Sequence, residues 1–274
     1  MIFRAFTSVP RSITSPDGAP VNGVYGLIGT LLQLIRTQKP RYVAVAFDLP
    51  EIPTFRHHLF PAYQGQRGPL GGADSANFAW QVDRACEVLD LIGIRWLSAR
   101  GFEADDVIGT LAVATASAGV RSLIVSTDRD LQQLVQPLVH VLIPGKVPIE
   151  IGPDEVRARL GISPDRIVDW KALAGDPSDN IPGVVGIGDK TAVTLVGLYG
   201  SWQGVYDNLD HLPVRQRAAL TAGRSNAELF AKVVKINCDL DLAVNIEDLV
   251  IDAMALPGRA GSALRLAGLR PEDS

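Results

Sequence analysis

The fold is decided by residues 94–130, which read IRWLSARGFEADDVIGTLAVATASAGVRSLIVSTDRD. A short apolar run, Ile94–Leu97, precedes a helical pattern from Glu103 to Ala118, and a second apolar run, Ser122–Val125, follows that helix. Runs of this length are typical of buried strands. Strands that alternate with helices predict the α/β class, with a mostly parallel central sheet flanked by helices.

The same alternation extends to both sides of this segment. Upstream, residues 21–36 carry apolar side chains at helical spacing, and residues 42–47 form a short apolar run. Residues 51–76 show little periodicity, which indicates an excursion over the carboxyl edge of the sheet. After Ile143 the pattern changes to helices, which we expect at 153–160, 163–173, 189–198 and 225–236. The chain therefore predicts an α/β domain over 1–145, a helical subdomain over 146–245, and a tail over 246–274 to which we assign no function.

Composition limits the class of protein. The chain has 274 residues, 47% of them hydrophobic, which is enough to bury a core. Its net charge of −4 argues against a uniformly basic surface that coats nucleic acid, but acids that converge on bound cations would still present a neutralised site to phosphate. No stretch approaches the roughly 20 apolar residues of a membrane helix, so we expect a cytoplasmic protein without a membrane partner. Cys86 and Cys238 lie far apart and predict neither a zinc site nor a disulfide. No oligomer is implied.

Acidic residues follow each predicted strand. The carboxyl ends of parallel strands share one edge of a sheet, so acids placed there come within reach of one another. So many anions can share a pocket only with cations between them, and oxygen ligands favour Mg²⁺, with Mn²⁺ as a substitute, over zinc. Two such ions about 4 Å apart activate water and stabilise a phosphodiester during hydrolysis. The candidate ligands are Asp48, Glu103, Asp105, Asp106, Asp128, Asp130, Asp176 and Asp179.

Ordinary structural roles remain open for each of these acids taken alone. A single Asp after a strand is more often a helix cap than a metal ligand. GFEADD, residues 101–106, also fits a first helical turn that complements the helix dipole, and Asp130 fits the N-cap of the helix after it. These roles are compatible with metal binding, so the joint placement carries the prediction.

Five ordered motifs resemble one family. They are VAVAFD (43–48), FRHHLFPAYQGQR (55–67), GFEADDVIGTLA (101–112), STDRDLQQLV (126–135) and GDPSDNIPGVVGIGDKTA (175–192). Together they resemble the 5′-nuclease domain of bacterial DNA polymerase I and the stand-alone exonucleases of the flap endonuclease superfamily, over nearly residues 1–240. The resemblance implies a PIN-like or resolvase-like α/β domain, followed by a helical subdomain with a helix-hairpin-helix element at 183–192, in a stand-alone form.

The resemblance also implies roles for single residues. It assigns Asp48, Glu103 and Asp105 to one metal ion, and Asp128, Asp130 and Asp179 to a second ion that Asp105 also approaches; Asp106 and Asp176 match outer members of the acidic set. Arg67 matches a residue that contacts the scissile phosphate at the base of a helical arch, expected here at about residues 60–82, and Arg56 belongs to the same motif. Tyr63 and Gln64 would contact DNA there. A solvated basic loop is the alternative for the two arginines.

The hairpin GVVGIGDKTA, residues 183–192, matches the element with which the family grips a duplex backbone without reading bases. Its glycines allow close approach to a phosphate, and the following helix offers unpaired amides and its positive end. The candidate contacts are Gly183, Gly186, Gly188, Lys190 and Thr191. The resemblance further implies K⁺ bound by carbonyls of this hairpin. The alternative for Gly183 is a plain helix cap.

Two departures from the family pattern bear on activity. The family has an apolar strand ending in Asp-Gly just before a segment like Ile2–Phe6, and we expect the natural start of the protein to lie upstream of Met1. The family also usually has a lysine at the position of Gln64, and glutamine lacks the charge that stabilises an oxyanion.

The sequence leaves three functions in competition. The leading one is a metal-dependent 5′-3′ exonuclease and flap endonuclease that acts on 5′-flap, nicked or frayed duplexes and RNA-primed ends in replication and repair, beside a DNA polymerase. The second is a structure-specific DNA-binding protein with impaired catalysis. The third is a small-molecule phosphatase or RNase, against which the duplex-gripping hairpin argues.

Overall fold

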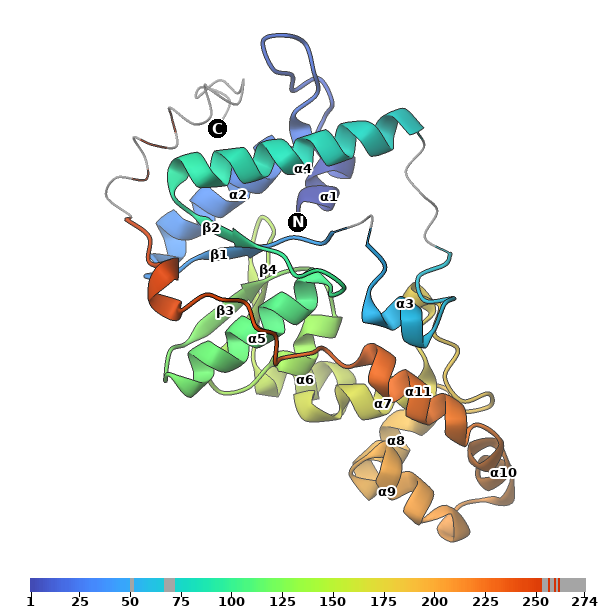
Figure 1. Cartoon of the computed structure of the whole chain (residues 1–274). Helices are drawn as coiled ribbons and strands as arrows, with labels where there is room; N and C mark the ends of the chain where they lie inside the picture. The colour runs from blue at the N-terminus through green and yellow to red at the C-terminus, as the bar shows by residue number, and fades with distance from the viewer. Residues whose placement is uncertain (50–51, 67–71, 253–255, 257–258, 260, 262–274) are drawn as a thin grey trace. The chain divides into compact units, whose positions relative to one another are not determined.

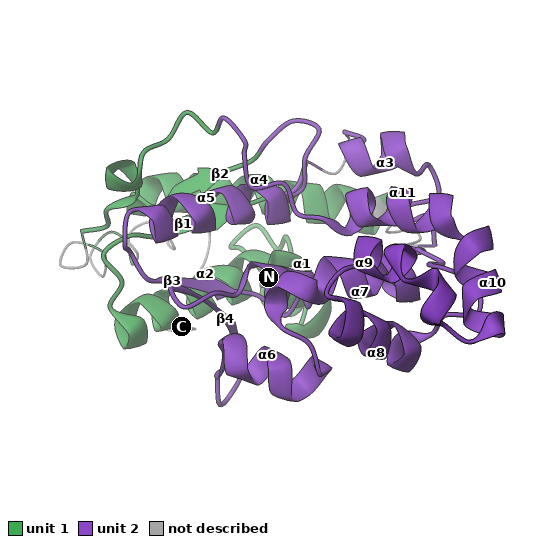
Figure 2. Ribbon diagram, turned by 90° about the horizontal axis from the view of Figure 1, so that it is seen from below, with its two compact units in different colours: residues 1–47, 69–98, 242–274 green, residues 48–68, 99–241 purple. Residues whose placement is uncertain are grey.

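The computed structural model of the chain describes residues 1–49, 52–66, 72–252, 256, 259 and 261 (Figure 1). The chain divides into two compact units, which Figure 2 colours separately. Unit 1 comprises residues 1–47, 69–98 and 242–274, and unit 2 comprises residues 48–68 and 99–241. Within the described ranges, no helix has the length and apolar character that a membrane span requires.

Unit 1 is a small helical layer on a two-stranded parallel ladder. Its elements are α1 (Ile2–Ser8), α2 (Asn22–Gln38), β1 (Ala44–Ala46), α4 (Gly72–Ile92), β2 (Arg95–Leu97) and η5 (Ile246–Leu249). Val45 of β1 lies opposite Trp96 of β2. The core forms where Ile28 of α2 and Leu89 of α4, both fully buried, pack together with the strands. Ile251 joins this core, so part of the predicted tail has a packing role.

The long helix α4 differs from the sequence prediction. We expected residues 51–76 to form an excursion with little periodicity, but the short helix α3 (Phe55–Leu59) lies inside that segment and α4 already begins at Gly72. The helical arch over about 60–82 stays a prediction. Phe78 and Val82 pack against the core at helical spacing, and burial of this apolar face stabilises the helix. Residues 67–71 of the expected arch lie outside the described residues.

Unit 2 contains a three-stranded sheet followed by a run of helices. The first part consists of α3, α5 (Ala104–Ser117), β3 (Ser122–Val125), η1 (Asp130–Leu134), β4 (Val139–Ile143), β5 (Ile149–Ile151) and α6 (Pro153–Leu160). The second part consists of η2 (Pro164–Arg166), α7 (Ile167–Ala174), η3 (Pro177–Asp179), α8 (Asp189–Tyr199), α9 (Trp202–Asp207), η4 (Leu209–His211), α10 (Val214–Ala222) and α11 (Arg224–Val234). β3 and β4 are parallel, and β5 is antiparallel to β4.

The α/β class is confirmed, while the predicted central sheet is divided. Among the described strands, β1 pairs with β2, and β3, β4 and β5 form a separate ladder. The alternation of strands and helices predicts where strands occur, but it carries no information on which strands hydrogen-bond to each other. The division of the sheet into two ladders was therefore not predictable from the sequence pattern. Strands as short as β5 also show too little periodicity to be recognised.

The helices of the second part pack around a core of their own. Leu173 of α7, Leu195 of α8 and Leu220 of α10 are buried in this cluster. Gly161, with φ of 76°, ends α6 in the left-handed conformation that favours glycine. The helices predicted near 153–160, 163–173, 189–198 and 225–236 are all present, whereas α9 and α10 were not predicted. Cys86 and Cys238 are half-buried free thiols.

Candidate metal centre

Acidic side chains from four separate stretches of unit 2 line one cavity of about 440 Å³. The fold brings them together because each lies at or near an end of a secondary-structure element. Asp48 Oδ1 accepts a hydrogen bond of 2.8 Å from the backbone N–H of Ala104, which fixes Asp48 against the first turn of α5. The acidic lining comprises Asp48, Glu103, Asp105, Asp128, Asp130 and Asp179.

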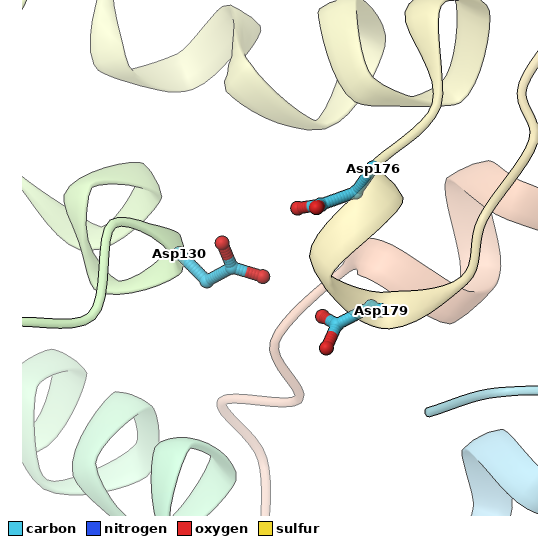
Figure 3. Close-up of side chains that lie close together, drawn as sticks. All are labelled: Asp130, Asp176 and Asp179. Atoms are coloured by element: carbon cyan, nitrogen blue, oxygen red, sulfur yellow. The ribbon is translucent and has the colours of Figure 1, made fainter. Parts of the chain in front are cut away.

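Three carboxylates form the tightest part of this acidic set. Asp130, Asp176 and Asp179 each place one oxygen within 4.8 Å of the others, and Figure 3 shows them facing a shared space from two different segments. Asp130 begins η1 and is not its N-cap, because Arg129 holds that position and the N–H of Asp130 is bonded instead to Asp128 Oδ1 at 2.9 Å. An arrangement of carboxylate oxygens without nitrogen or sulfur fits a hard divalent cation such as Mg²⁺.

A buried lysine already lies within that cluster. Lys171 of α7 is 5% exposed, and its ammonium donates hydrogen bonds to both Asp130 and Asp176. Burial disfavours the charged ammonium, but the two carboxylates outweigh that effect and raise the pKa of Lys171. Lys171 was not among the predicted site residues. Its only signal was a basic side chain on a mostly apolar helix, five positions before Asp176.

The remaining acids repel one another in the metal-free protein. Burial raises the pKa of Glu103 to about 7, against the opposing effect of the Arg56 guanidinium. Burial, together with the carboxylates of Asp128 and Asp48, also raises the pKa of Asp105 well above its usual range. These shifts mean that the cluster gives up part of its negative charge unless cations are present to stabilise it.

Arg56 and Asp106 depart from their predicted roles. Both side chains are buried, and they form a bidentate pair with distances of 2.7 and 2.8 Å. The oxygens of Asp106 also accept hydrogen bonds from the backbone N–H groups of Glu103 and Asn237. Asp106 is therefore already fully engaged and is placed to orient the start of α5 rather than to bind metal directly. Arg56 is likewise not the solvated loop residue that we considered: it lines the cavity, and its guanidinium donates to Asp106 and to two backbone carbonyls.

Tyr63 and Gln64 connect the segment after α3 to the acidic cavity. The hydroxyl of Tyr63 lies 3.2 Å from Glu103 Oε2, and the Gln64 amide donates to the Tyr63 hydroxyl at 3.0 Å and to Asp179 Oδ1 at 3.2 Å. Burial is the main cause that raises the pKa of Tyr63, so its hydroxyl stays protonated. Gln64 thus gives Asp179 a neutral donor. Arg67, the other predicted residue of this motif, lies outside the described residues.

The hairpin glycines divide into one internal and two exposed positions. Gly183 is buried with φ of 66°, and a Cβ there would lie 2.4 Å from the backbone nitrogen of Gly175. The close approach that Gly183 permits is therefore to the chain itself, which corrects its prediction as a phosphate contact. Gly186 and Gly188 are exposed, and Gly188 is the N-cap of α8. Lys190 is exposed in the first turn of that helix and Thr191 is half-buried beside it.

Family models match almost the whole chain. Residues 1–161 match the model described as 5′-3′ exonuclease, N-terminal resolvase-like domain, and residues 162–256 match 5′-3′ exonuclease, C-terminal SAM fold. The chain is 38% identical over 247 residues to DNA polymerase I of Mycobacterium tuberculosis, a match that covers 89% of the chain and 27% of that protein. It is 37% identical over 245 residues to the thermostable DNA polymerase I of Thermus thermophilus, covering 89% of the chain and 28% of that protein. The chain thus spans about a quarter of the length of these relatives.

Solved structures with the same fold include two nucleases. The 5′-exonuclease of bacteriophage T5, with bound divalent zinc, superposes with a TM-score of 0.67 at 22% identity, over 89% of this chain and 91% of that one. The catalytic core of Rad2 in complex with DNA substrate superposes with a TM-score of 0.57 at 15% identity, over 96% of this chain and 85% of that one. At these identities the likeness establishes the fold.

Proposed function

Because the chain belongs to the 5′-3′ exonuclease family, we propose that it is a 5′-3′ exonuclease and flap endonuclease that hydrolyses DNA phosphodiesters with the help of two divalent cations. The single observation that carries the proposal is the convergence of acidic side chains on one cavity of unit 2. These carboxylates, most of them partly or fully buried, are stabilised at neutral pH by cations between them, and paired hard cations serve phosphoryl transfer.

The ligands divide into two groups on this proposal. Asp48, Glu103 and Asp105 would hold one ion, and Asp105 would also approach the second ion, held by Asp128, Asp130 and Asp179 with Asp176 beside them. When bound, Mg²⁺ or Mn²⁺ would supply an activated water and a positive charge beside the scissile phosphate. Lys171 keeps Asp130 and Asp176 in place and offsets part of their charge. Asp106 fixes the start of α5, where Glu103 and Asp105 lie.

The substrate on this proposal is DNA with a 5′ end at a branch, nick or frayed terminus, including RNA-primed ends. Support comes from the exposed hairpin, where Gly186 and Gly188 leave room for a phosphate and the start of α8 offers backbone N–H groups. Lys190 adds a positive charge, and carbonyls of the same hairpin are the expected ligands of K⁺. Arg67 at the arch base remains a proposed phosphate contact. A DNA polymerase is the proposed functional partner, since the relatives that share this region are polymerases.

We also propose that residues 1–145 supply most of the metal ligands and residues 146–245 bind the duplex and add Asp176 and Asp179 to the metal centre, with no catalytic role for residues 246–274. Much of the second segment packs around its own apolar core, which supports a separate binding role.

A second function is favoured by one observation. Gln64 donates a neutral hydrogen bond to Asp179 at 3.2 Å, at a position where the family usually carries a lysine. Without that charge, a developing oxyanion is less well stabilised. A structure-specific DNA-binding protein with impaired catalysis would bind branched DNA in the presence of Mg²⁺ and release no product.

Cleavage of a labelled 5′-flap duplex tests both functions. We expect Mg²⁺-dependent release of the flap, loss of cleavage in EDTA, and a loss of at least about a hundredfold in the variant Asp128→Asn, which keeps the side-chain size but removes the charge. Asp154→Asn is the matched control, since Asp154 is 92% exposed and lies outside the cavity. Binding without cleavage by the unchanged protein would favour the second function, and cleavage that persists in Asp128→Asn would refute the two-metal proposal.

A further inference from the structure

The end of α11 is held by side chains from other elements of unit 2. Arg56 Nε donates to the carbonyl of Val233 at 2.9 Å, and Arg56 Nη2 donates to the carbonyl of Lys235 at 3.1 Å. Gln133 Nε2 donates to the carbonyl of Val234 at 3.1 Å, and Gln133 Oε1 accepts from the N–H of Ile236 at 3.0 Å. The last carbonyls of a helix have no partner within it, so these side chains satisfy groups that would otherwise be buried and unpaired.

Asp106 extends this contact by one residue, because its Oδ1 accepts from the N–H of Asn237 at 2.8 Å. One polar backbone group of each residue from Val233 to Asn237 is therefore bonded to a side chain of Arg56, Gln133 or Asp106. We call these three side chains the α11 clamp.

The guanidinium of the clamp is held by four hydrogen bonds and an ion pair. Arg56 is 3% exposed, donates to two backbone carbonyls and to both oxygens of Asp106, and lies 3.3 Å from Glu103 Oε2. A planar guanidinium bonded in this way has one orientation, and that orientation ties three elements together. A role in binding substrate phosphate is unnecessary to explain its burial.

Each member of the clamp sits beside a candidate metal ligand. Asp106 adjoins Asp105 and accepts the N–H of Glu103 at 2.9 Å, so it fixes the start of α5. Gln133 lies in η1, the element that begins with Asp130. The clamp thus joins both groups of proposed ligands to one short backbone segment, and a shift of that segment would move the two groups relative to each other.

We propose that the α11 clamp is a positioning device that sets the affinity of the proposed metal centre, with Gln133 acting on it without contacting any ligand. This inference rests on the proposed two-metal function. Groups that orient metal ligands typically contribute about 10- to 100-fold to affinity, because carboxylates held in place lose less freedom when an ion binds. Gln133 is the informative member, since Arg56 and Asp106 lie in direct contact with Glu103.

The test is Mn²⁺ binding by the full chain, measured by titration calorimetry and by the loss of the free Mn²⁺ paramagnetic resonance signal. We expect Gln133→Met, which keeps the length and removes both polar atoms, to weaken Mn²⁺ binding about tenfold. Gln133→Asn retains the amide but is one methylene too short, so it should weaken binding in the same direction with a smaller loss of stability. The variant Gln133→Asn replaces Gln133→Met in the test if Gln133→Met does not fold.

Thr110→Val is the matched control. Thr110 Oγ1 accepts from the N–H of Leu240 at 3.2 Å and donates to the backbone carbonyl of Asp106 within α5 at 2.9 Å. The variant therefore removes hydrogen bonds of α5 and the same downstream segment, but leaves the side chains of Arg56, Gln133 and Asp106 and their contacts unchanged. We expect a comparable fall in melting temperature and unchanged Mn²⁺ affinity. Unchanged affinity in both Gln133 variants would overturn the inference, and so would equal weakening in Thr110→Val, which would indicate general loosening. Failure of the unchanged protein to bind Mn²⁺ would instead refute the two-metal function itself.

Discussion

Replacing Glu103 with glutamine should stabilise the metal-free protein at alkaline pH. Glu103 is 17% exposed, and burial raises its pKa from 4.5 to about 7. A carboxyl whose pKa is higher in the folded protein than in the unfolded chain contributes stability that is fully present below pH 4.5 and is lost as pH rises through about 7. The unfolded chain then releases a proton that the folded protein retains.

The size of the effect follows from the same two values. The difference between 4.5 and about 7, at about 1.4 kcal/mol per pH unit, amounts to about 3 kcal/mol by pH 8. Glutamine resembles the protonated carboxyl in size and charge. The variant Glu103→Gln should therefore not lose this part of the unfolding free energy as pH rises. In EDTA the variant and the unchanged protein should unfold alike at pH 4, and the variant should be more stable by about 3 kcal/mol, or about 5–10 °C in melting temperature, at pH 8.

Urea unfolding in EDTA between pH 4 and pH 8 measures this directly, with Glu87→Gln as the control because Glu87 is 59% exposed on α4. Added Mg²⁺ should make the unchanged protein more stable than Glu103→Gln at pH 8, since the carboxylate binds the ion and the amide does so poorly. A variant that follows the same pH dependence as the unchanged protein in EDTA, or is less stable at pH 8, would refute the conclusion that burial disfavours the charged form of Glu103.

Three other changes test separate parts of the fold. Arg56→Met should cost about 3–5 kcal/mol of unfolding free energy in urea titrations, because it leaves the buried carboxylate of Asp106 without a counter-charge; a cost below about 1 kcal/mol would contradict the structure. Lys171→Met should lower the melting temperature in EDTA and enlarge the increase produced by Mg²⁺, since an ion then takes over the charge that the ammonium supplied; an unchanged Mg²⁺ response would count against its place in the cluster. Gly183→Ala should destabilise by at least about 2 kcal/mol because of its positive φ and the backbone of Gly175 beside it, whereas Gly188→Ala, whose Cβ meets nothing within 4 Å, should leave the melting temperature nearly unchanged.

Sequence patterns predicted the elements whose apolar face is long enough to show a period. The helices near residues 21–36 and 103–118 and the strand at 122–125 were placed within about two residues of their ends. α4 was not among the predicted helices, and its start follows a glycine-rich segment without apolar spacing. Which strands pair depends on contacts between distant segments, and no local pattern records them.

The predicted site was recovered more fully for its acids than for the groups that support them. Acids that follow strands can be expected to meet at one edge, and the cavity collects six of them. From sequence alone, basic residues such as Arg56 and Lys171 are expected to be exposed to solvent or to bind phosphate. Burial of a charged group becomes evident only when the positions of its partners are known. Gln133 gave no signal, because its partners are backbone groups more than a hundred positions away.

The distribution of basic groups leaves most of the charge of this acidic cluster unmatched by the described side chains. Arg56 lies near Glu103, but both of its terminal nitrogens are engaged by Asp106, so much of its charge is matched by an acid outside the cavity lining. Lys171 offsets only the carboxylates that it contacts, and Gln64 offers Asp179 a hydrogen bond without charge. The chain thus holds its acids in place while neutralising few of them. Protons bound by Glu103 and Asp105 take up part of the excess, because the pKa values of both are raised. On the proposed function, divalent cations would displace those protons, so metal binding and proton release would be one linked equilibrium.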